Sequence, residues 1–307
     1  MPQKVILDTD IGDDIDDAMA LALILASPEL ELVGVTTVFG NVAARSRQAR
    51  TLLKAAGERF TRIPVAAGCG GTMASRPVPG RGTVDYLKGA VPNQDAASLA
   101  ERDLPKQDPR HGVDLIIDLI MNGDGDIIPI PIGALTNIAM AMVKEPRIVA
   151  KIPRIATMSA EFKRGFSEWN IKCDPEAAAL VYNSGVPMSV TTWDIGNTVK
   201  FGQAELDRLA TGKGGVAQYL TRAIRTWQAA HDHTPMPSLF DPMAVATLVK
   251  PELCTWLTGT VAVELQGQHT YGFTYLHTNP NGKHRVAWDA DRDASFEYYL
   301  SRVLALT

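Results

Sequence analysis

Six aspartates occupy ten consecutive positions near the start of the chain, directly after a short apolar run at 5–7. They are Asp8, Asp10, Asp13, Asp14, Asp16 and Asp17. A second apolar run, residues 18–26, follows at once, so this segment predicts a buried strand, a tight turn and a helix. Carboxylates this close repel one another, and a hard cation relieves the repulsion because Ca²⁺ and Mg²⁺ prefer oxygen ligands. The acidic turn (residues 8–17) therefore predicts a metal at the carboxyl end of the first strand.

Two other interpretations of the acidic turn are less economical. A solvated loop in which Asp16 or Asp17 caps the helix needs only one or two of the six carboxylates. An EF-hand loop does not fit, because Gly12 comes one place early when counted from Asp8 and the twelfth position is Met19 rather than glutamate.

Composition excludes several classes of protein. The chain has 307 residues, of which 46% are hydrophobic and 21% charged, as in ordinary globular proteins. The net charge of −4 offers no basic field for nucleic acid. Cys69, Cys173 and Cys254 are odd in number and widely spaced, which argues against a disulfide framework and a zinc site and favours a reducing cytoplasm. With no expected signal peptide or membrane span, we expect a cytoplasmic enzyme.

Predicted strands and helices alternate along the first two thirds of the chain. Strands are expected at 5–7, 31–39, 64–67, 127–132, 155–158 and 188–193, and helices at 18–26, 42–56, 113–121, 137–143 and from Asp174 to before Gly185. Pro129 and Pro131 predict an irregular or edge position for the strand at 127–132. Residues 68–110 are expected to be mostly a long loop.

The pattern changes after residue 200. Helices are expected at 203–211, 214–230, 241–249 and 293–305, and two alternating strands at 258–265 and 270–276, joined through Gly267. Repeated strand–helix units favour a parallel sheet covered on both faces. We predict one α/β domain, residues 1–307, with an open, mostly parallel, Rossmann-like sheet and an antiparallel addition near the C-terminus.

Polar residues follow several of the predicted strands. Ligands bind at the carboxyl ends of strands in open α/β sheets, so these residues are expected to form one crevice. They are Asp8 to Asp10, Gly40-Asn41, the segment Ile132 to Asn137, the loop residues Glu161, Glu168 and Asn170, and the helix start Asp241-Pro242.

Four motifs in this order resemble those of the inosine-uridine-preferring nucleoside hydrolase family, and the resemblance runs from Lys4 to the C-terminus. They are Asp8-Thr9-Asp10 with Asp16-Asp17-Ala18, Gly133-Ala134-Leu135-Thr136-Asn137, Glu168-Trp169-Asn170-Ile171 with Cys173-Asp174-Pro175-Glu176-Ala177-Ala178, and Asp241-Pro242. The resemblance implies hydrolysis of the N-glycosidic bond of ribonucleosides to ribose and a free base.

The resemblance also implies roles for individual residues. Ca²⁺ would be held by Asp10, Asp17, Asp241 and the backbone carbonyl of Ile132. Asp10 would act as the general base that takes a proton from the metal-activated water. Asp16, Asn41, Glu168 and Asn170 would bind the ribose. Asn41 and Asn137 also have ordinary structural interpretations, in a turn and at a helix start.

Three departures from the family pattern affect these roles. The opening turn is one residue longer and has Ile11 where proline is common, so Asp13 and Asp14 compete with Asp16 and Asp17. Phe240 stands where many members have a histidine proposed to protonate the leaving base. The loop at 159–168 is shorter and carries Lys163 and Arg164, for which a solvated basic pair is the simpler interpretation.

Protonation of the leaving base is therefore left to other candidates. His231 and His233 precede Asp241 and titrate near neutrality when unperturbed. Phe240 and other aromatic residues are candidates to stack on a base. The others are Trp169, Trp193, Trp227, Phe162 and Phe166. The sequence does not fix a preference for purine or pyrimidine bases.

Two rival functions remain at this level. A haloacid dehalogenase-like phosphohydrolase would use Asp8 as its nucleophile, and a non-catalytic nucleoside- or metal-binding protein could share the scaffold. The expected partner is a small ribonucleoside, with neither nucleic acid nor a membrane, and the family resemblance implies a homodimer or homotetramer.

Overall fold

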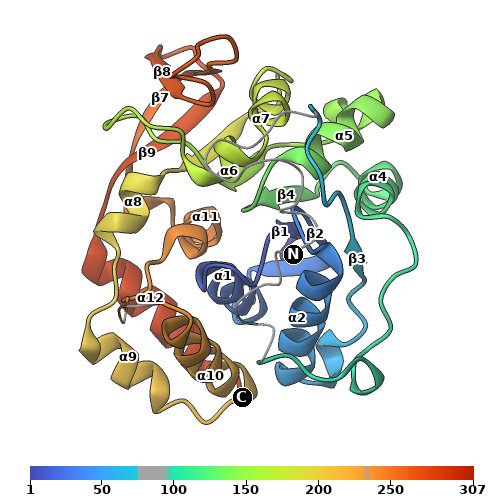
Figure 1. Cartoon of the computed structure of the whole chain (residues 1–307), viewed down its shortest axis with the longest axis vertical. Helices are drawn as coiled ribbons and strands as arrows, with labels where there is room; N and C mark the ends of the chain where they lie inside the picture. Colours follow the sequence, from blue (N-terminus) through green and yellow to red (C-terminus); the bar gives the residue numbers. More distant parts are fainter. Residues whose placement is uncertain (75–93, 95–96, 232, 234) are drawn as a thin grey trace.

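The computed structural model describes residues 1–74, 94, 97–231, 233 and 235–307. Strands and helices alternate as far as β6, and helices then dominate before three final strands and a closing helix (Figure 1). The strands are β1 (Gln3–Thr9), β2 (Leu30–Thr37), β3 (Val65–Ala67), β4 (Ile128–Pro131), β5 (Ile155–Met158), β6 (Met188–Thr191), β7 (Cys254–Val263), β8 (Thr274–Thr278) and β9 (His284–Ala290). The α-helices are α1 (Asp16–Leu25), α2 (Val42–Ala55), α4 (Gly112–Asn122), α5 (Thr136–Lys144), α6 (Trp169–Cys173), α7 (Pro175–Tyr182), α8 (Trp193–Thr198), α9 (Gln203–Ala210), α10 (Gly215–Ala229), α11 (Phe240–Val249) and α12 (Arg292–Ala305). Short 3-10 turns lie at Glu58–Phe60, Glu101–Asp103, Pro146–Ala150 and Pro251–Leu253.

The first sheet is entirely parallel and has the order β3-β2-β1-β4. Because β1 is central, its last residues lie between the ends of two neighbours. Asp8 is level with Thr36 of β2 and Pro131 of β4. This register brings the carboxyl ends of β1, β2 and β4 to one edge, where the acidic turn begins.

The second sheet has the order β5-β6-β9-β7-β8 and is mixed. β5, β6 and β9 are parallel, whereas β7 runs antiparallel to both β8 and β9. β4 ends the first sheet as predicted from its prolines, which have no N–H to donate to a further strand. It contacts β5 nonetheless, and Thr157 Oγ1 donates to the Pro131 carbonyl at 2.7 Å. The predicted α/β class, mostly parallel with an antiparallel addition, is confirmed.

Two buried helices, α1 and α11, pack against each other near the middle of the molecule (Figure 1). All ten residues of α1 are buried, which suits a helix that is apolar on every face beyond its first turn. α11 is similarly apolar after Asp241. Their pairing brings the start of α1 and the start of α11 together, although the two lie far apart in the sequence.

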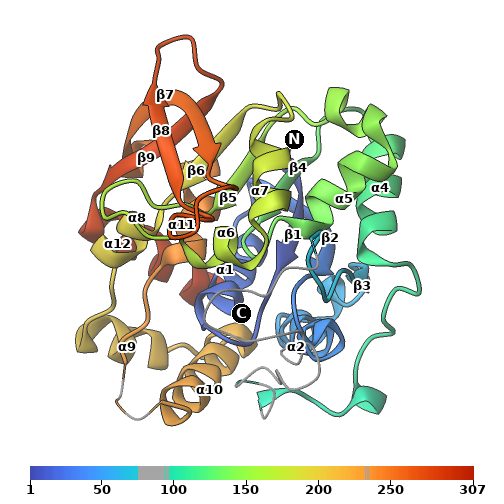
Figure 2. The same ribbon diagram turned by 45° about the horizontal axis from the view of Figure 1, so that its top comes forward.

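The second half of the chain contains elements that periodicity did not predict. β9 lies between β6 and β7 in the second sheet and joins the antiparallel addition to the parallel strands. Figure 2 shows β7, β8 and β9 together at one side of the molecule. The helices α6 and α8 are also new, and the strand expected at 188–193 ends at Thr191 because Trp193 begins α8. Elements of four to seven residues are too short to show a clear period.

Part of the long loop expected at 68–110, residues 75–93 and 95–96, lies outside the described residues, and the described part includes the 3-10 turn Glu101–Asp103. None of the helices that the structure describes is both long and apolar enough to cross a membrane.

Candidate active site

A pocket of about 470 Å³ opens at the carboxyl ends of the strands. Both carboxylates and aromatic side chains line it. The pocket is lined by Asp10, Asp13, Asp14, Asp16, Asp17, Ile132, Met158, Glu168, Trp169, Asn170, Trp193, Trp227, His231, Phe240 and Asp241. The crevice predicted from the strand ends is thus present, and most of the predicted site residues meet in it.

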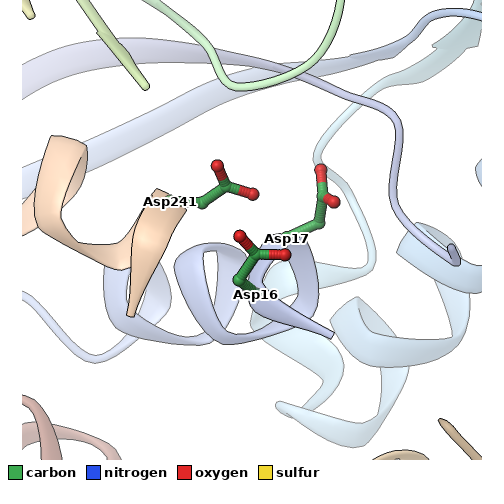
Figure 3. A group of neighbouring side chains, drawn as sticks. All are labelled: Asp16, Asp17 and Asp241. Atoms are coloured by element: carbon green, nitrogen blue, oxygen red, sulfur yellow. The ribbon is translucent and has the colours of Figure 1, made fainter. Parts of the chain in front are cut away.

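Three buried carboxylates face one another at the starts of α1 and α11 (Figure 3). Asp16, Asp17 and Asp241 each offer an oxygen, and these oxygens all lie within 4.8 Å of one another. None of the three side chains is more than 6% exposed. Oxygen ligands in such a group fit a hard cation such as Ca²⁺.

Burial raises the pKa of all three carboxyls well above its ordinary value, and the negative charges of neighbouring aspartates, including Asp10 and Asp14, raise it further. Thr9 Oγ1 donates to Asp17 Oδ1, and the helix N-terminus favours negative charge on Asp16 and Asp17. Neither aspartate caps α1, because Ile15 occupies the cap position and no side chain bonds there. The capping interpretation is therefore wrong.

Asp10 lies beside this group without belonging to it. Its Oδ1 lies so close to Gly133 that a Cβ added there would be 2.7 Å away. Burial raises the pKa of Asp10 to about 6, although the positive charge of Arg45 opposes that rise. The resemblance paired Asp10 with Asp17 and Asp241, whereas the structure groups Asp16 with these two most closely.

Arg45, a completely buried residue of α2, was not predicted. Its Nη2 donates to Asp13 Oδ2 at 2.7 Å, and Nη1 donates to the backbone carbonyls of Asp10 and Ile11. One signal for it exists in the sequence, because Arg45 lies in helical register with the buried residues Ala49 and Leu52.

These contacts distinguish Asp13 and Asp14 from Asp16 and Asp17, which competed for the same positions in the site. Asp13 pairs with Arg45, and Asp14 is exposed, with its Oδ1 accepting from the backbone N–H of Ile15 at 2.7 Å. Asp16 and Asp17 are the buried pair that faces Asp241.

The loop after β5 supplies Glu168 and Asn170. Glu168 accepts hydrogen bonds from the backbone N–H groups of Ala160, Asn170 and Ile171, and burial raises its pKa to about 7. Asn170 Nδ2 donates to the carbonyls of Ile132 and Met158 at 2.8 and 3.1 Å. The amide oxygen is therefore the Asn170 group suited to accept from a substrate hydroxyl, and the Ile132 carbonyl keeps a second lone pair.

Aromatic residues also line the pocket. Phe240 stacks on Trp193 with centroids 6.5 Å apart, and the Trp193 ring is contacted by Arg164, whose guanidinium carbon lies 4.8 Å from its centroid. His231 also lines the pocket and bonds through Nδ1 to the Trp227 carbonyl at 2.7 Å. His233 does not line it, and neither do Phe162 and Phe166.

Other predicted residues have structural roles. Asn41 caps α2 by accepting from Ala44 N at 3.1 Å and is not a lining residue, so the structure does not bring it into the pocket. Asn137 donates to Asp8 Oδ1 at 2.8 Å and to the Thr37 carbonyl at 3.1 Å, which makes it a brace between strands.

Asp8 and Lys163 do not line the pocket either, and each forms hydrogen bonds outside it. Asp8 is completely buried and accepts from Thr36 Oγ1 at 2.6 Å, so it cannot serve as the exposed nucleophile of a phosphohydrolase. Lys163 Nζ donates to the Trp288 carbonyl at 2.6 Å. Lys163 and Arg164 are both exposed, as expected for a solvated basic pair, and Arg164 also pairs with Asp194 at 3.5 Å.

Comparison with known proteins agrees with this geometry. The family model described as "Inosine-uridine preferring nucleoside hydrolase" matches residues 5–297. The inosine-uridine preferring nucleoside hydrolase of Crithidia fasciculata is 33% identical over 92% of this chain and 91% of its own length. Uridine nucleosidase 1 of Arabidopsis thaliana is 28% identical over 98% and 93%.

Solved structures show the same likeness. A plant nucleoside hydrolase, PpNRh1, superposes with a TM-score of 0.83 at 27% identity and covers 99% of this chain and 100% of its own. A purine-preferring ribonucleoside hydrolase from Gardnerella vaginalis gives a TM-score of 0.80 at 26% identity, with 99% of both chains covered. The match of the family model over nearly the whole chain, with relatives of this identity and coverage, shows that the protein belongs to the nucleoside hydrolase family.

Proposed function

We propose that this protein hydrolyses the N-glycosidic bond of ribonucleosides in a Ca²⁺-dependent reaction. The observation that carries the proposal is the group of three buried carboxylates, Asp16, Asp17 and Asp241, in a pocket that also has an aromatic side. Carboxylates whose pKa is raised by burial and mutual repulsion gain most from a cation, which suits a resident Ca²⁺. The names of its relatives agree on nucleosides while differing on the base.

The site residues divide between the cation and the sugar. We propose that Asp10, Asp17, Asp241 and the carbonyl of Ile132 hold Ca²⁺, which when bound orients and acidifies a water. Asp16 faces Asp17 and Asp241 and is proposed to accept a ribose hydroxyl beside the cation. Glu168 and the amide oxygen of Asn170 would bind the rest of the ribose. We assign no substrate role to Asn41.

Asp10 is proposed as the general base. Its carboxylate takes a proton from the attacking water as the oxygen bonds to the anomeric carbon. The carbon–nitrogen bond to the base then breaks through a state with oxocarbenium character. Nearby carboxylates stabilise the positive charge that develops on the sugar, because they are already oriented and buried.

The leaving base must gain a proton on nitrogen. Phe240 cannot supply one, whereas the imidazole of His231 lines the same pocket. We propose His231 as the group that protonates the base and Phe240 as part of the surface that contacts it. The base preference is left to experiment.

We further propose that residues 1–307 act as one domain and that the protein self-associates. Buried residues from β1, α1, α10, α11 and α12 belong to one hydrophobic cluster, which supports the first proposal. A mass in solution of 33.2 kDa by light scattering would contradict the second.

Release of reducing sugar from a panel of purine and pyrimidine ribonucleosides tests the proposed function. We expect release that is lost on chelation and restored by Ca²⁺, with the panel giving the base preference. Binding of a nucleoside by calorimetry without sugar release, in protein that contains Ca²⁺, would instead identify a non-catalytic binding protein.

A further inference from the structure

The guanidinium of Arg45 forms hydrogen bonds to residues outside its own helix. Its side chain is completely buried, and its donors reach several acceptors around the carboxyl ends of β1 and β2. Nε donates to the Phe39 carbonyl at 2.6 Å, Nη1 to the carbonyls of Asp10 and Ile11, the latter at 3.1 Å, and Nη2 to Asp13 Oδ2 at 2.7 Å. Burial of a guanidinium is costly unless it is paired and hydrogen-bonded, and here both conditions are met.

These bonds fix the backbone at the catalytic aspartate. The guanidinium is planar and presents its donors in a rigid fork, so acceptors bound to it take fixed relative positions. On the far side, Asp10 Oδ1 fits against Gly133, where a Cβ would also be 2.8 Å from Val38 Cγ1. The Asp10 carboxylate is thus held between a main chain anchored by Arg45 and a wall that tolerates no larger residue.

Arg45 also forms an ion pair with the lengthened acidic turn. Asp13 lies in the part of the acidic turn that is longer than the family pattern, and it forms the ion pair with Arg45. The chain therefore places one internal cation among its six clustered carboxylates, in addition to any cation that the pocket binds.

We propose that Arg45 is a positioning residue, which holds the Asp10 main chain and the lengthened acidic turn in the arrangement that catalysis requires. The inference rests on the proposed function, since Asp10 is there the general base and a cation ligand. It implies that both the geometry of the fork and its charge are needed.

Arg45→Lys tests this, because lysine keeps the charge and loses the fork. Arg50→Lys is the matched control. Arg50 lies on the same helix, is 2% exposed, and pairs with Glu101 at 2.6 and 2.8 Å, away from the pocket. Both variants are expected to lower the melting temperature, so stability alone does not distinguish them.

The distinguishing measurements are made well below both melting temperatures. We expect Arg45→Lys to lower kcat by about 10–100-fold with little change in KM, and to weaken Ca²⁺ binding in calorimetry by at least about 10-fold. Arg50→Lys is expected to keep wild-type kcat and Ca²⁺ affinity. Equal kcat and Ca²⁺ affinity in Arg45→Lys and the wild type, or equal losses in both variants, would overturn the proposal.

The role of Arg45 and the proposed function can be refuted by different results. Absence of sugar release by the wild-type protein would refute the function, and the Ca²⁺ affinities of the two variants would still decide the role of Arg45. If Arg45→Lys does not fold, Asp13→Asn removes only the ion pair. Unchanged kcat and Ca²⁺ affinity in that variant would overturn the proposal.

Discussion

At the scale of single residues, the pocket depends on carboxylates that differ in position more than in chemistry. Asp10 is wedged against Gly133, while Asp16 and Asp17 face Asp241. Three further aspartates of the same turn do other work, since Asp8 braces strands, Asp13 pairs with Arg45 and Asp14 is exposed. Conservative substitutions to asparagine can therefore separate their roles, because they remove charge with little change of shape.

Asp10→Asn should lower kcat by about 10²–10⁴-fold, because the attacking water loses its proton acceptor. KM for the ribonucleoside should change little, since the proposed ribose groups are intact. Steady-state sugar release measures both constants. Asp124→Asn, at an exposed residue that does not line the pocket, is the control. An Asp10→Asn variant as active as the control would refute the assignment of the base.

Asp241→Asn and Asp16→Asn should fail in different ways. Loss of the Asp241 carboxylate should lower the Ca²⁺ content found by elemental analysis, because a proposed ligand is gone. Asp16→Asn should retain Ca²⁺ and raise KM, because a proposed ribose contact is lost. If Asp16→Asn loses Ca²⁺ as fully as Asp241→Asn does, the ribose role of Asp16 is wrong and Asp16 is a Ca²⁺ ligand. Its closeness to Asp17 and Asp241 would explain that result.

His231→Ala should lower kcat by about 10²-fold or more for substrates whose base must be protonated to leave. His233→Ala provides a matched control, because it removes the same imidazole from a residue that does not line the pocket. Steady-state assays at neutral pH compare the two. Similar activity in both variants would refute the assignment of His231 as the group that protonates the base.

At the scale of elements, the site depends on how short helices are packed. α8 approaches α11 so closely that a Cβ on Gly196 would overlap the ring of Phe240. Phe240 precedes Asp241, so this contact fixes the start of α11 and one proposed ligand. Two non-glycine residues that follow strands have positive φ values, Phe39 after β2 with 63° and Ala160 after β5 with 75°.

Gly196→Ala should cost about 1–3 kcal/mol of unfolding free energy, because it overpacks the α8–α11 contact. It should also lower kcat by displacing Phe240 and with it Asp241. Thr198→Ala, at an exposed position of the same helix, should leave both properties near wild type. Denaturant unfolding and sugar release measure the two effects. A stable and fully active Gly196→Ala protein would show that the ring moves aside freely.

At the scale of the whole molecule, buried carboxyl groups link stability to pH and to Ca²⁺. Burial raises the pKa of Asp8 to about 7, of Asp10 to about 6 and of Glu168 to about 7. The folded protein therefore keeps protons that the unfolded chain releases from about pH 4. In Ca²⁺-free protein the free energy of unfolding must fall as the pH rises from about 4 to about 7.

Added Ca²⁺ should reverse this trend, because it binds the ionised carboxylates of the folded protein. At 100 times its dissociation constant it should stabilise the fold by about 2.7 kcal/mol, with the gain growing towards pH 7. Melting temperatures with Ca²⁺ and with chelator, across this pH range, check the prediction. Asp241→Asn is the control that should lose the Ca²⁺ response. Equal melting temperatures with and without Ca²⁺ at pH 7 would contradict it.

The sequence by itself determined much of the architecture and the chemistry of the pocket. The apolar runs around the acidic turn fixed β1 and α1, because alternation and helical periodicity depend on near neighbours. Polar residues after β1, β4 and β5, and at the start of α11, predicted one crevice, because parallel strands end at a common edge. Asp10, Glu168, Asn170 and Asp241 were found in this way.

Only the tertiary structure decided which of these side chains lie next to one another. Arg45 reaches Asp10 across 35 positions of sequence, and Asp16 meets Asp241 from a distant segment of the chain. The tertiary structure also places Asn41 at the cap of α2 and Asn137 between strands, and it places β9 between β6 and β7. Such outcomes follow from packing between distant segments, on which local periodicity and spacing carry no information.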